Sequence, residues 1–214
     1  MKKIVAVMTG IFLVVAGFNA QAIDVRVKGF IVPASCSFTL VNAVIDYGTI
    51  DPQLLSATNY TTLEAKSTPY NIKCSSGTQL AVTAVDNRAA SKIPDMMRRQ
   101  FDHPVTDRFN FGLGLTAANQ KIGGYIMQLL NSTADGRPVL PLYGDGQGRW
   151  VGGEGALGQG GHLTSWYSGT MAPVRLTVIS GYLQFQAVIN KTSELNFKDV
   201  ARLDGLATLE LRYL

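Results

Sequence analysis

Cysteine and histidine are both scarce in this sequence, which has two of each among its 214 residues. Cys36 and Cys74 do not form a C-x-x-C spacing, and neither has a histidine close to it in the sequence. His103 and His162 lie in loop-like stretches, and the chain has neither an H-E-x-x-H nor a G-x-S-x-G motif. We therefore expect a protein that is not an enzyme and that holds no metal and no cofactor.

Long apolar runs are also scarce, since only the first residues of the chain contain one. Lys2 and Lys3 precede the apolar stretch 4–18, and Ala20 and Ala22 provide the small residues of a cleavage site. A membrane-spanning helix needs roughly 20 apolar residues, and this stretch is shorter. We expect residues 1–22 to be a removable signal peptide rather than a membrane anchor.

Two cysteines in an exported chain predict a single disulfide, Cys36–Cys74, because disulfides are typical of oxidising compartments. The alternatives are a metal-binding pair or a reactive thiol, and the spacing supports neither. Closing a loop of this size would stabilise the fold by about 3–4 kcal/mol in the chain-entropy model.

The excess of positive charge is small. The formal net charge is +4, and removal of Lys2 and Lys3 with the signal peptide would leave +2. The basic pair Arg98-Arg99 has Asp95 and Asp102 nearby, which indicates a solvated surface. We expect no nucleic-acid partner.

The two ends of the mature chain show the clearest periodicity. Both alternate apolar residues with polar or charged ones, as strands with one buried face do. Glycine is unusual inside a strand because it packs nothing, so Gly29 marks either a close approach to a surface or a simple bulge. The apolar faces are Ile23, Val25, Val27, Gly29 and Ile31 at the N-terminus, and Gly205, Ala207, Leu209, Leu211 and Tyr213 at the C-terminus.

These ends also resemble a known family. The pattern V-x-V-K-G-x-I-V-x-A-x-C from Val25 to Cys36 resembles the N-terminal extension of chaperone–usher fimbrial subunits, the pilins. A-x-L-x-L-x-Y from Ala207 to Tyr213 is similar to their last strand, with its penultimate tyrosine. Two shorter stretches, I-D-Y-G-T-I at 45–50 and Y-N-I-x-C at 70–74, are similar to other pilin segments.

The resemblance implies an immunoglobulin-like β-sandwich that lacks its own last strand. Residues 23–32 would be a donor-strand extension and residues 33–214 the sandwich domain. The missing strand leaves a groove beside the C-terminal strand, which a periplasmic chaperone fills first. At an outer-membrane usher, the extension of the next fimbrial subunit replaces the chaperone. The resemblance thus implies a structural subunit of a surface fimbria, exported to the periplasm and then to the cell surface.

Between the two ends, short apolar stretches separated by turn residues favour an all-β fold. We expect strands over 41–50, 109–115 and 122–130. Residues 68–73 and 79–85 would form a hairpin, and 89–99 a short helix. The segments 174–179 and 182–189 are either a hairpin or one kinked strand.

Residues 143–161 contain nine glycines among nineteen residues. The stretch Gly153–Gly158 matches G-x-G-x-x-G formally, but no strand–helix unit surrounds it, so we interpret the region as a long, mobile glycine-rich insertion and not as a nucleotide site.

Two alternative functions remain open. A fimbria-like periplasmic protein could fold its N-terminal strand back into its own groove and never polymerise. A carbohydrate-binding module or adhesin could instead use Trp150, Trp166 and Tyr167 to stack against sugars around the glycine-rich stretch.

Overall fold

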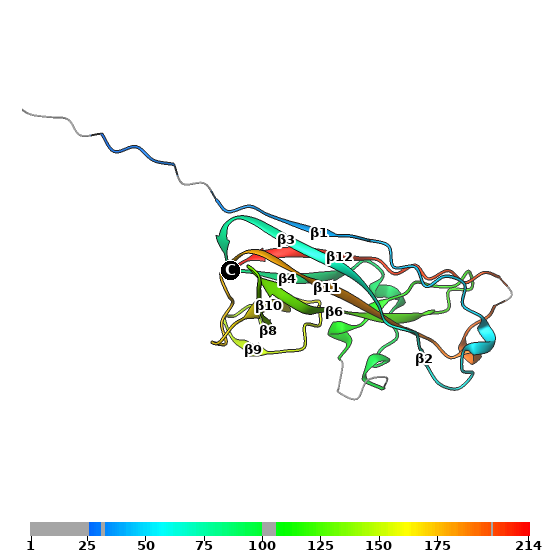
Figure 1. The fold of residues 1–214 in the computed structure, drawn as a ribbon. Helices are drawn as coiled ribbons and strands as arrows, with labels where there is room; N and C mark the ends of the chain where they lie inside the picture. Colours follow the sequence, from blue (N-terminus) through cyan, green and yellow to red (C-terminus); the bar gives the residue numbers. More distant parts are fainter. Residues whose placement is uncertain (1–25, 31–32, 100–105, 198) are drawn as a thin grey trace, which may run out of the picture. The chain divides into compact units, whose positions relative to one another are not determined.

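The computed structural model of the chain describes residues 26–30, 33–99, 106–197 and 199–214. Residues 34–214 form one compact unit, built from two antiparallel sheets (Figure 1). Sheet A contains β1 (Cys36–Leu40), β2 (Thr61–Thr62), β3 (Lys66–Thr78), β5 (Phe111–Gly112), β6 (Gly123–Ala134), β7 (Arg137–Pro138) and β11 (Leu176–Ile189). Sheet B contains β4 (Leu80–Asp86), β8 (Leu140–Gly144), β9 (Trp150–Gly152), β10 (Leu163–Tyr167) and β12 (Ala207–Tyr213).

The strand order is β1-β3-β11-β6-β5 in sheet A, where β2 lies beside β11 and β7 beside β6. In sheet B the order is β12-β4-β10-β8-β9. The predicted all-β sandwich is therefore confirmed. The middle of the chain, residues 84–165, belongs to this sandwich, because it contains β6 of sheet A together with β8 and the start of β10 of sheet B.

The core forms between the two sheets, from residues that alternate along each strand. In β3, Tyr70 and Ile72 are buried, whereas Asn71 and Lys73 between them are not. Trp166 of β10 is fully buried, stacks on Tyr70 at 6.3 Å between ring centroids, and donates a hydrogen bond to Ser132 Oγ. This layer of aromatic and aliphatic side chains holds the two sheets together.

The predicted hairpin over 68–73 and 79–85 is wrong, although both strands exist. β3 continues to Thr78 and pairs with β1 and β11, whereas β4 pairs with β12 and β10 in the other sheet. The chain passes from one sheet to the other within a single residue, Gln79. Sequence periodicity reports strand faces but not which strand is the partner, so it could not distinguish these arrangements.

Two other expectations about local structure are corrected, and one open alternative is decided. Residues 41–50 form no strand, since the strand near them is β1, which ends at Leu40. The expected strand over 109–115 is reduced to β5 and an isolated bridge between Leu115 and Lys121. The long strand β11 shows that 174–189 is one strand, whose pairing with β6 is irregular between Ser180 and Tyr182.

The helical content of the described residues consists of short 3-10 turns. These are η1 (Pro52–Leu54), η2 (Ala89–Ser91), η3 (Met97–Arg99), η4 (Asp107–Phe109) and η5 (Thr192–Glu194). The predicted helix over 89–99 is thus replaced by η2 and η3. Between them, Met96 and Met97 pack in a small second core with Ile126 and Val188. No helix in the described ranges has the length and apolar character needed to cross a bilayer.

Candidate functional site: an open groove between two edge strands

The strands β1 and β12 are the edges of their sheets, since each has a neighbour on one side only within the described residues. Both edges lie on the same long side of the sandwich, where they run beside each other (Figure 1). An edge strand presents unpaired backbone N–H and C=O groups, which readily pair with a further strand. This side of the molecule is therefore open in two senses, because hydrogen-bonding groups and core side chains are both uncovered.

The apolar side chains that face inward from these two edges are only half-buried. Phe38 of β1 and Leu211 of β12 retain intermediate exposure. Their cross-strand neighbours one strand further in, Ile72 and Val82, are each 0% exposed. Burial is thus complete one strand inside the sandwich and incomplete at the edge, so core side chains remain uncovered there.

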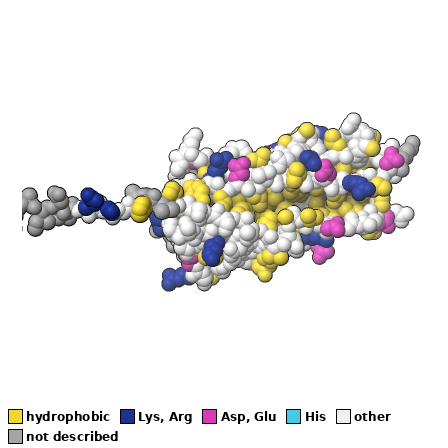
Figure 2. Space-filling model, turned by 90° about the horizontal axis from the view of Figure 1, so that it is seen from above, with side chains coloured by type: hydrophobic (Ala, Val, Ile, Leu, Met, Phe, Trp, Pro, Cys, Tyr) yellow, Lys and Arg dark blue, Asp and Glu magenta, His cyan; other side chains and the backbone are white. Residues whose placement is uncertain are grey.

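The uncovered core forms a groove of about 620 Å³. Figure 2 shows a continuous band of hydrophobic side chains along this face. The groove is lined by Phe38, Leu40, Ala43, Val44, Ile45 and Tyr47 on one side, by Leu203, Gly205, Leu206, Ala207 and Leu209 on the other, and by Leu113, Tyr125, Met127, Phe185 and Ala187 beneath. These are overwhelmingly apolar side chains, so the groove suits an apolar occupant.

Tyr47 and Tyr125 line the groove with their rings and bring no charge into it. The Tyr47 hydroxyl donates to Phe185 O and accepts from Ala187 N, both at 3.3 Å. Burial raises the pKa of Tyr47, and burial together with the nearby carboxylate of Asp86 raises the pKa of Tyr125. Both hydroxyls therefore stay neutral at physiological pH.

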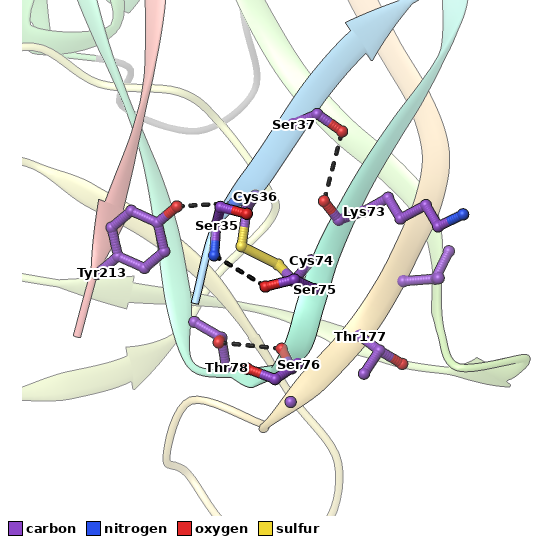
Figure 3. Close-up of a disulfide and its surroundings, with 12 residues drawn as sticks. Ser35, Cys36, Ser37, Lys73, Cys74, Ser75, Ser76, Thr78, Thr177 and Tyr213 are labelled. Carbon is purple, nitrogen blue, oxygen red and sulfur yellow. Dashed lines mark hydrogen bonds between the residues drawn. A yellow bond between two sulfur atoms is a disulfide. The ribbon is translucent and has the colours of Figure 1, made fainter. Parts of the chain in front are cut away.

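One end of the groove is tied together by covalent and hydrogen bonds (Figure 3). The predicted disulfide Cys36–Cys74 is confirmed and joins β1 to β3. The Tyr213 hydroxyl accepts a hydrogen bond from Cys36 N at 2.8 Å, which connects the end of β12 to the start of β1. Ser35 N donates to Ser75 Oγ at 3.1 Å just before the disulfide. These bonds fix the two edges relative to each other at this end.

The predicted acceptor residues are distributed along the groove. Gly205, Ala207 and Leu209 line it, Leu211 packs against the core beyond it, and Tyr213 makes the bond to Cys36. A Cβ atom on Gly205 would lie 2.8 Å from Tyr125 Cε1. The absence of a side chain at this position therefore keeps the groove wall close to its floor.

The structure describes only some of the predicted donor residues. Ile23, Val25 and Ile31 lie outside the described residues, as does the whole predicted signal peptide. Val27 is 92% exposed, and a Cβ added to Gly29 would have no atom within 4 Å. Residues 26–30 carry no strand, so their role as a donor strand stays a prediction.

The predicted sugar-stacking residues do not form a platform. Trp166 is 0% exposed inside the core and cannot meet a ligand, so that part of the prediction is wrong. Trp150 is half-buried, and its ring lies so close to Gly144 that a Cβ there would be 2.6 Å from Trp150 Cζ3. Tyr167 is half-buried on the neighbouring part of sheet B.

His162 is buried, at 7% exposure, and packs edge-on against the rings of Phe109 and Tyr143. Burial, with a smaller contribution from the charge of Arg108, lowers its pKa to about 4. His103 falls outside the described residues. Within the described ranges, no three His, Cys, Asp or Glu side chains gather in a way that could hold a metal ion.

The glycine-rich stretch closes the side of the sandwich away from β1 and β12. Leu129 N of β6 donates to Gly155 O, and Leu157 N donates to Met127 O, both at 2.8 Å. On sheet B, the Thr164 hydroxyl donates to Ala156 O at 2.9 Å. The segment 153–158 thus bridges the two sheets, and the expectation of a mobile loop is wrong for this part of the chain.

Several residues that line the groove were not found from the sequence. Phe38 and Leu40 alternate directly after Cys36, a signal that could have located β1. Leu113, Met127 and Phe185 come from other elements, and only the folded arrangement places them beneath the groove. No periodicity in the chain could have brought these three together.

Comparison with known proteins gives two matches. Residues 25–126 match the family model described as "Protein of unknown function (DUF1120)". The chain is similar to Protein GltF of Escherichia coli (strain K12), with 26% identity over an alignment that covers 94% of this chain and 94% of that protein. Neither match names a pilin, so the resemblance to fimbrial subunits rests on the sequence patterns quoted above.

Proposed function

We propose that the chain is a structural subunit of a surface fimbria, in which each subunit accepts a β-strand in its groove and donates its own N-terminal extension to the next. The observation that carries this proposal is the groove itself. It lies between two edge strands and is lined with apolar side chains, several of them only partly buried, which supports a further apolar strand as its occupant. The alternating apolar residues at 23–31 would form a strand of the required kind.

The energetics favour such an exchange. Burying four aliphatic side chains, those of Ile23, Val25, Val27 and Ile31, would contribute on the order of 8 kcal/mol before the entropic costs of association. Backbone hydrogen bonds to the free edge of β12 would add to this and would fix the strand in one register. A subunit with an empty groove would be poorly protected against non-specific association through the same edge.

The remaining elements of the proposal follow from this role. A periplasmic chaperone would protect the groove before assembly, and an outer-membrane usher would be the place of exchange. The disulfide is typical of an oxidising compartment such as the periplasm. The proposal assigns the protein no catalytic activity and no cofactor.

Assembly of the purified mature chain tests the proposal. We expect heat-resistant ladders on a denaturing gel and high-mass species in size-exclusion chromatography. Leu209→Asp should abolish both, because a carboxylate would enter the apolar groove. Thr208→Asp is the matched control, since Thr208 is exposed on the opposite face of β12 and the new carboxylate would stay outside the groove, so this variant should still assemble.

Deletion of residues 23–32 tests the donor strand in the same assembly experiment. The shortened subunit should accept a strand but donate none, so it should cap chains of wild-type subunits and form no ladder alone. Circular dichroism and the unfolding temperature establish that each variant is folded. Ladders from the deletion variant, or a wild type that stays monomeric at all concentrations, would contradict the proposal.

A further inference from the structure

The exposed face of β12 carries one acidic and one basic side chain. Arg212 Nη2 lies 2.7 Å from Glu210 Oε2, and the two side chains are 59% and 38% exposed. They point away from the core, since Leu209 and Leu211 occupy the inward face of the same strand. They belong to β12, which pairs with β4 on one side. Within the described part of sheet B, no strand pairs with its other side.

The N-terminal extension carries a complementary pattern. In an extended conformation, Asp24, Arg26 and Lys28 share the face opposite the apolar one. An acidic and a basic residue are therefore spaced two apart on both strands, as Asp24 and Arg26 on one and as Glu210 and Arg212 on the other. The order of the charges is acid then base in each case.

We propose that these charges set the register of strand exchange between two copies of this chain. The extension of a second copy of this chain pairs antiparallel with β12, with Val27 opposite Leu209. Asp24 then lies opposite Arg212 and Arg26 opposite Glu210. This inference rests on the proposed function, because it specifies the occupant of the same groove.

The apolar residues fit the same register. In an antiparallel pair, residues directly opposite each other point to the same face, so the inward residues of the two strands meet pairwise. Ile31 lies opposite Gly205, where the acceptor strand has no side chain of its own. The remaining pairs are Gly29 with Ala207, Val27 with Leu209, Val25 with Leu211 and Ile23 with Tyr213.

Neighbouring antiparallel registers are electrostatically worse. A shift of two residues in one direction places Asp24 opposite Glu210. The opposite shift places Arg26 opposite Arg212 and leaves Ile23 beyond the end of the chain. Like charges directly opposite each other destabilise a strand pair, and opposite charges stabilise it. Only the proposed register forms both ion pairs without a like-charge contact.

The direction in which an extension can run along β12 distinguishes the extension of a second copy from the chain's own. Ser35 and Cys36 are held at the Tyr213 end of β12 by the bonds described above. An extended chain spans at most about 3.6 Å per residue, so no conformation of the chain could carry Ile31 further than roughly 14 Å from Ser35. Gly205 is eight strand residues from Tyr213, or roughly 27 Å away. The chain's own extension therefore cannot place Ile31 opposite Gly205.

A strand folded back into its own groove would instead run parallel to β12, with Ile31 near Leu211. This parallel register places Asp24 opposite Asp204 and leaves Arg26 opposite Leu206. Neither ion pair forms. The reach of the chain, rather than its charges, thus separates exchange between two copies from closure within one.

Exchanging the charges within each strand tests the proposal. The donor variant carries Asp24→Arg with Arg26→Asp, and the acceptor variant carries Glu210→Arg with Arg212→Glu. Each variant keeps its composition and net charge, and the acceptor variant keeps its own ion pair. We expect each to assemble roughly threefold to tenfold more slowly than the wild type, as two lost pairs and two new repulsions imply. The chain carrying all four changes should recover the wild-type rate.

A disulfide cross-link reports the register independently. No cysteine in the described residues is free, so a chain with Lys28→Cys and Thr208→Cys should form covalent ladders under mild oxidation, since these positions lie opposite each other. Lys28→Cys with Glu210→Cys is the control and should cross-link weakly. The inference is overturned if the fourfold variant shows no recovery or if the control pair cross-links as well as the first. A wild type that never assembles overturns the proposed function as well.

Discussion

The two long sides of the sandwich differ in how their sheet edges are covered. Each sheet must end somewhere, and an uncovered edge leaves core side chains and backbone groups exposed. On one side, the segment 153–158 bonds to β6 and to sheet B and buries Leu157 completely. On the other side, β1 and β12 leave a groove in which apolar side chains such as Phe38 and Leu209 stay partly exposed. The same chain therefore closes one side itself and leaves the other uncovered.

The comparison shows what a closing segment requires. The segment 153–158 approaches its neighbours so closely that several of its positions admit no side chain. A Cβ on Gly155 would lie 2.1 Å from Leu129 O, and one on Gly153 would lie 2.4 Å from Tyr143 Cε2. The Tyr143 hydroxyl accepts hydrogen bonds from Glu154 N and Ala156 N. Glycine at position 155 thus allows the backbone of this segment to lie against the backbone of β6.

The largest expected effect of a substitution lies on the closed side. Gly155→Ala should reduce the free energy of unfolding by about 3 kcal/mol or more, because the new Cβ meets a backbone carbonyl that cannot move without breaking the bonds to β6. Gly148→Ala is the matched control. Gly148 also has a positive φ, of 93°, but a Cβ there meets nothing within 4 Å. It should cost about 1 kcal/mol, as urea denaturation would measure.

A smaller effect should appear as a pH dependence of the closed side. Burial keeps His162 neutral, with a pKa of about 4, whereas it is near 6.5 in the unfolded chain. Between these values the unfolded state binds a proton that the folded state does not. The free energy of unfolding should therefore fall as the pH drops from about 6.5 to about 4, by on the order of 2 kcal/mol.

His162→Phe provides the control for that pH dependence. A phenyl ring keeps the edge-on packing against Phe109 and Tyr143 and cannot be protonated. Urea denaturation across this pH range should show a flatter profile in the variant than in the wild type. Identical profiles would mean that other groups cause the pH dependence.

The sequence predicted the architecture in general and the groove in part. Alternation identified β3, β4, β6 and β12, and the two cysteines predicted the disulfide, because these depend on local pattern or on a single possible pairing. Alternation could not show that β3 and β4 belong to different sheets. Nor could it show that the glycines at 153–158 seal a side of the sandwich, since glycine-rich sequence is equally typical of loops. Trp166 was misassigned because aromatic residues serve cores and ligand sites alike.

Amide hydrogen exchange of the mature subunit, before and after assembly, tests the central difference between the two sides most directly. In the unassembled subunit, alternate amides of β12 that face away from β4 should exchange rapidly, whereas those of Leu129 and Leu157 should be protected. After assembly, the β12 amides should become protected and those of Leu129 and Leu157 should change little. If β12 is already protected in the unassembled subunit, or stays unprotected after assembly, the groove is not the place where subunits exchange strands.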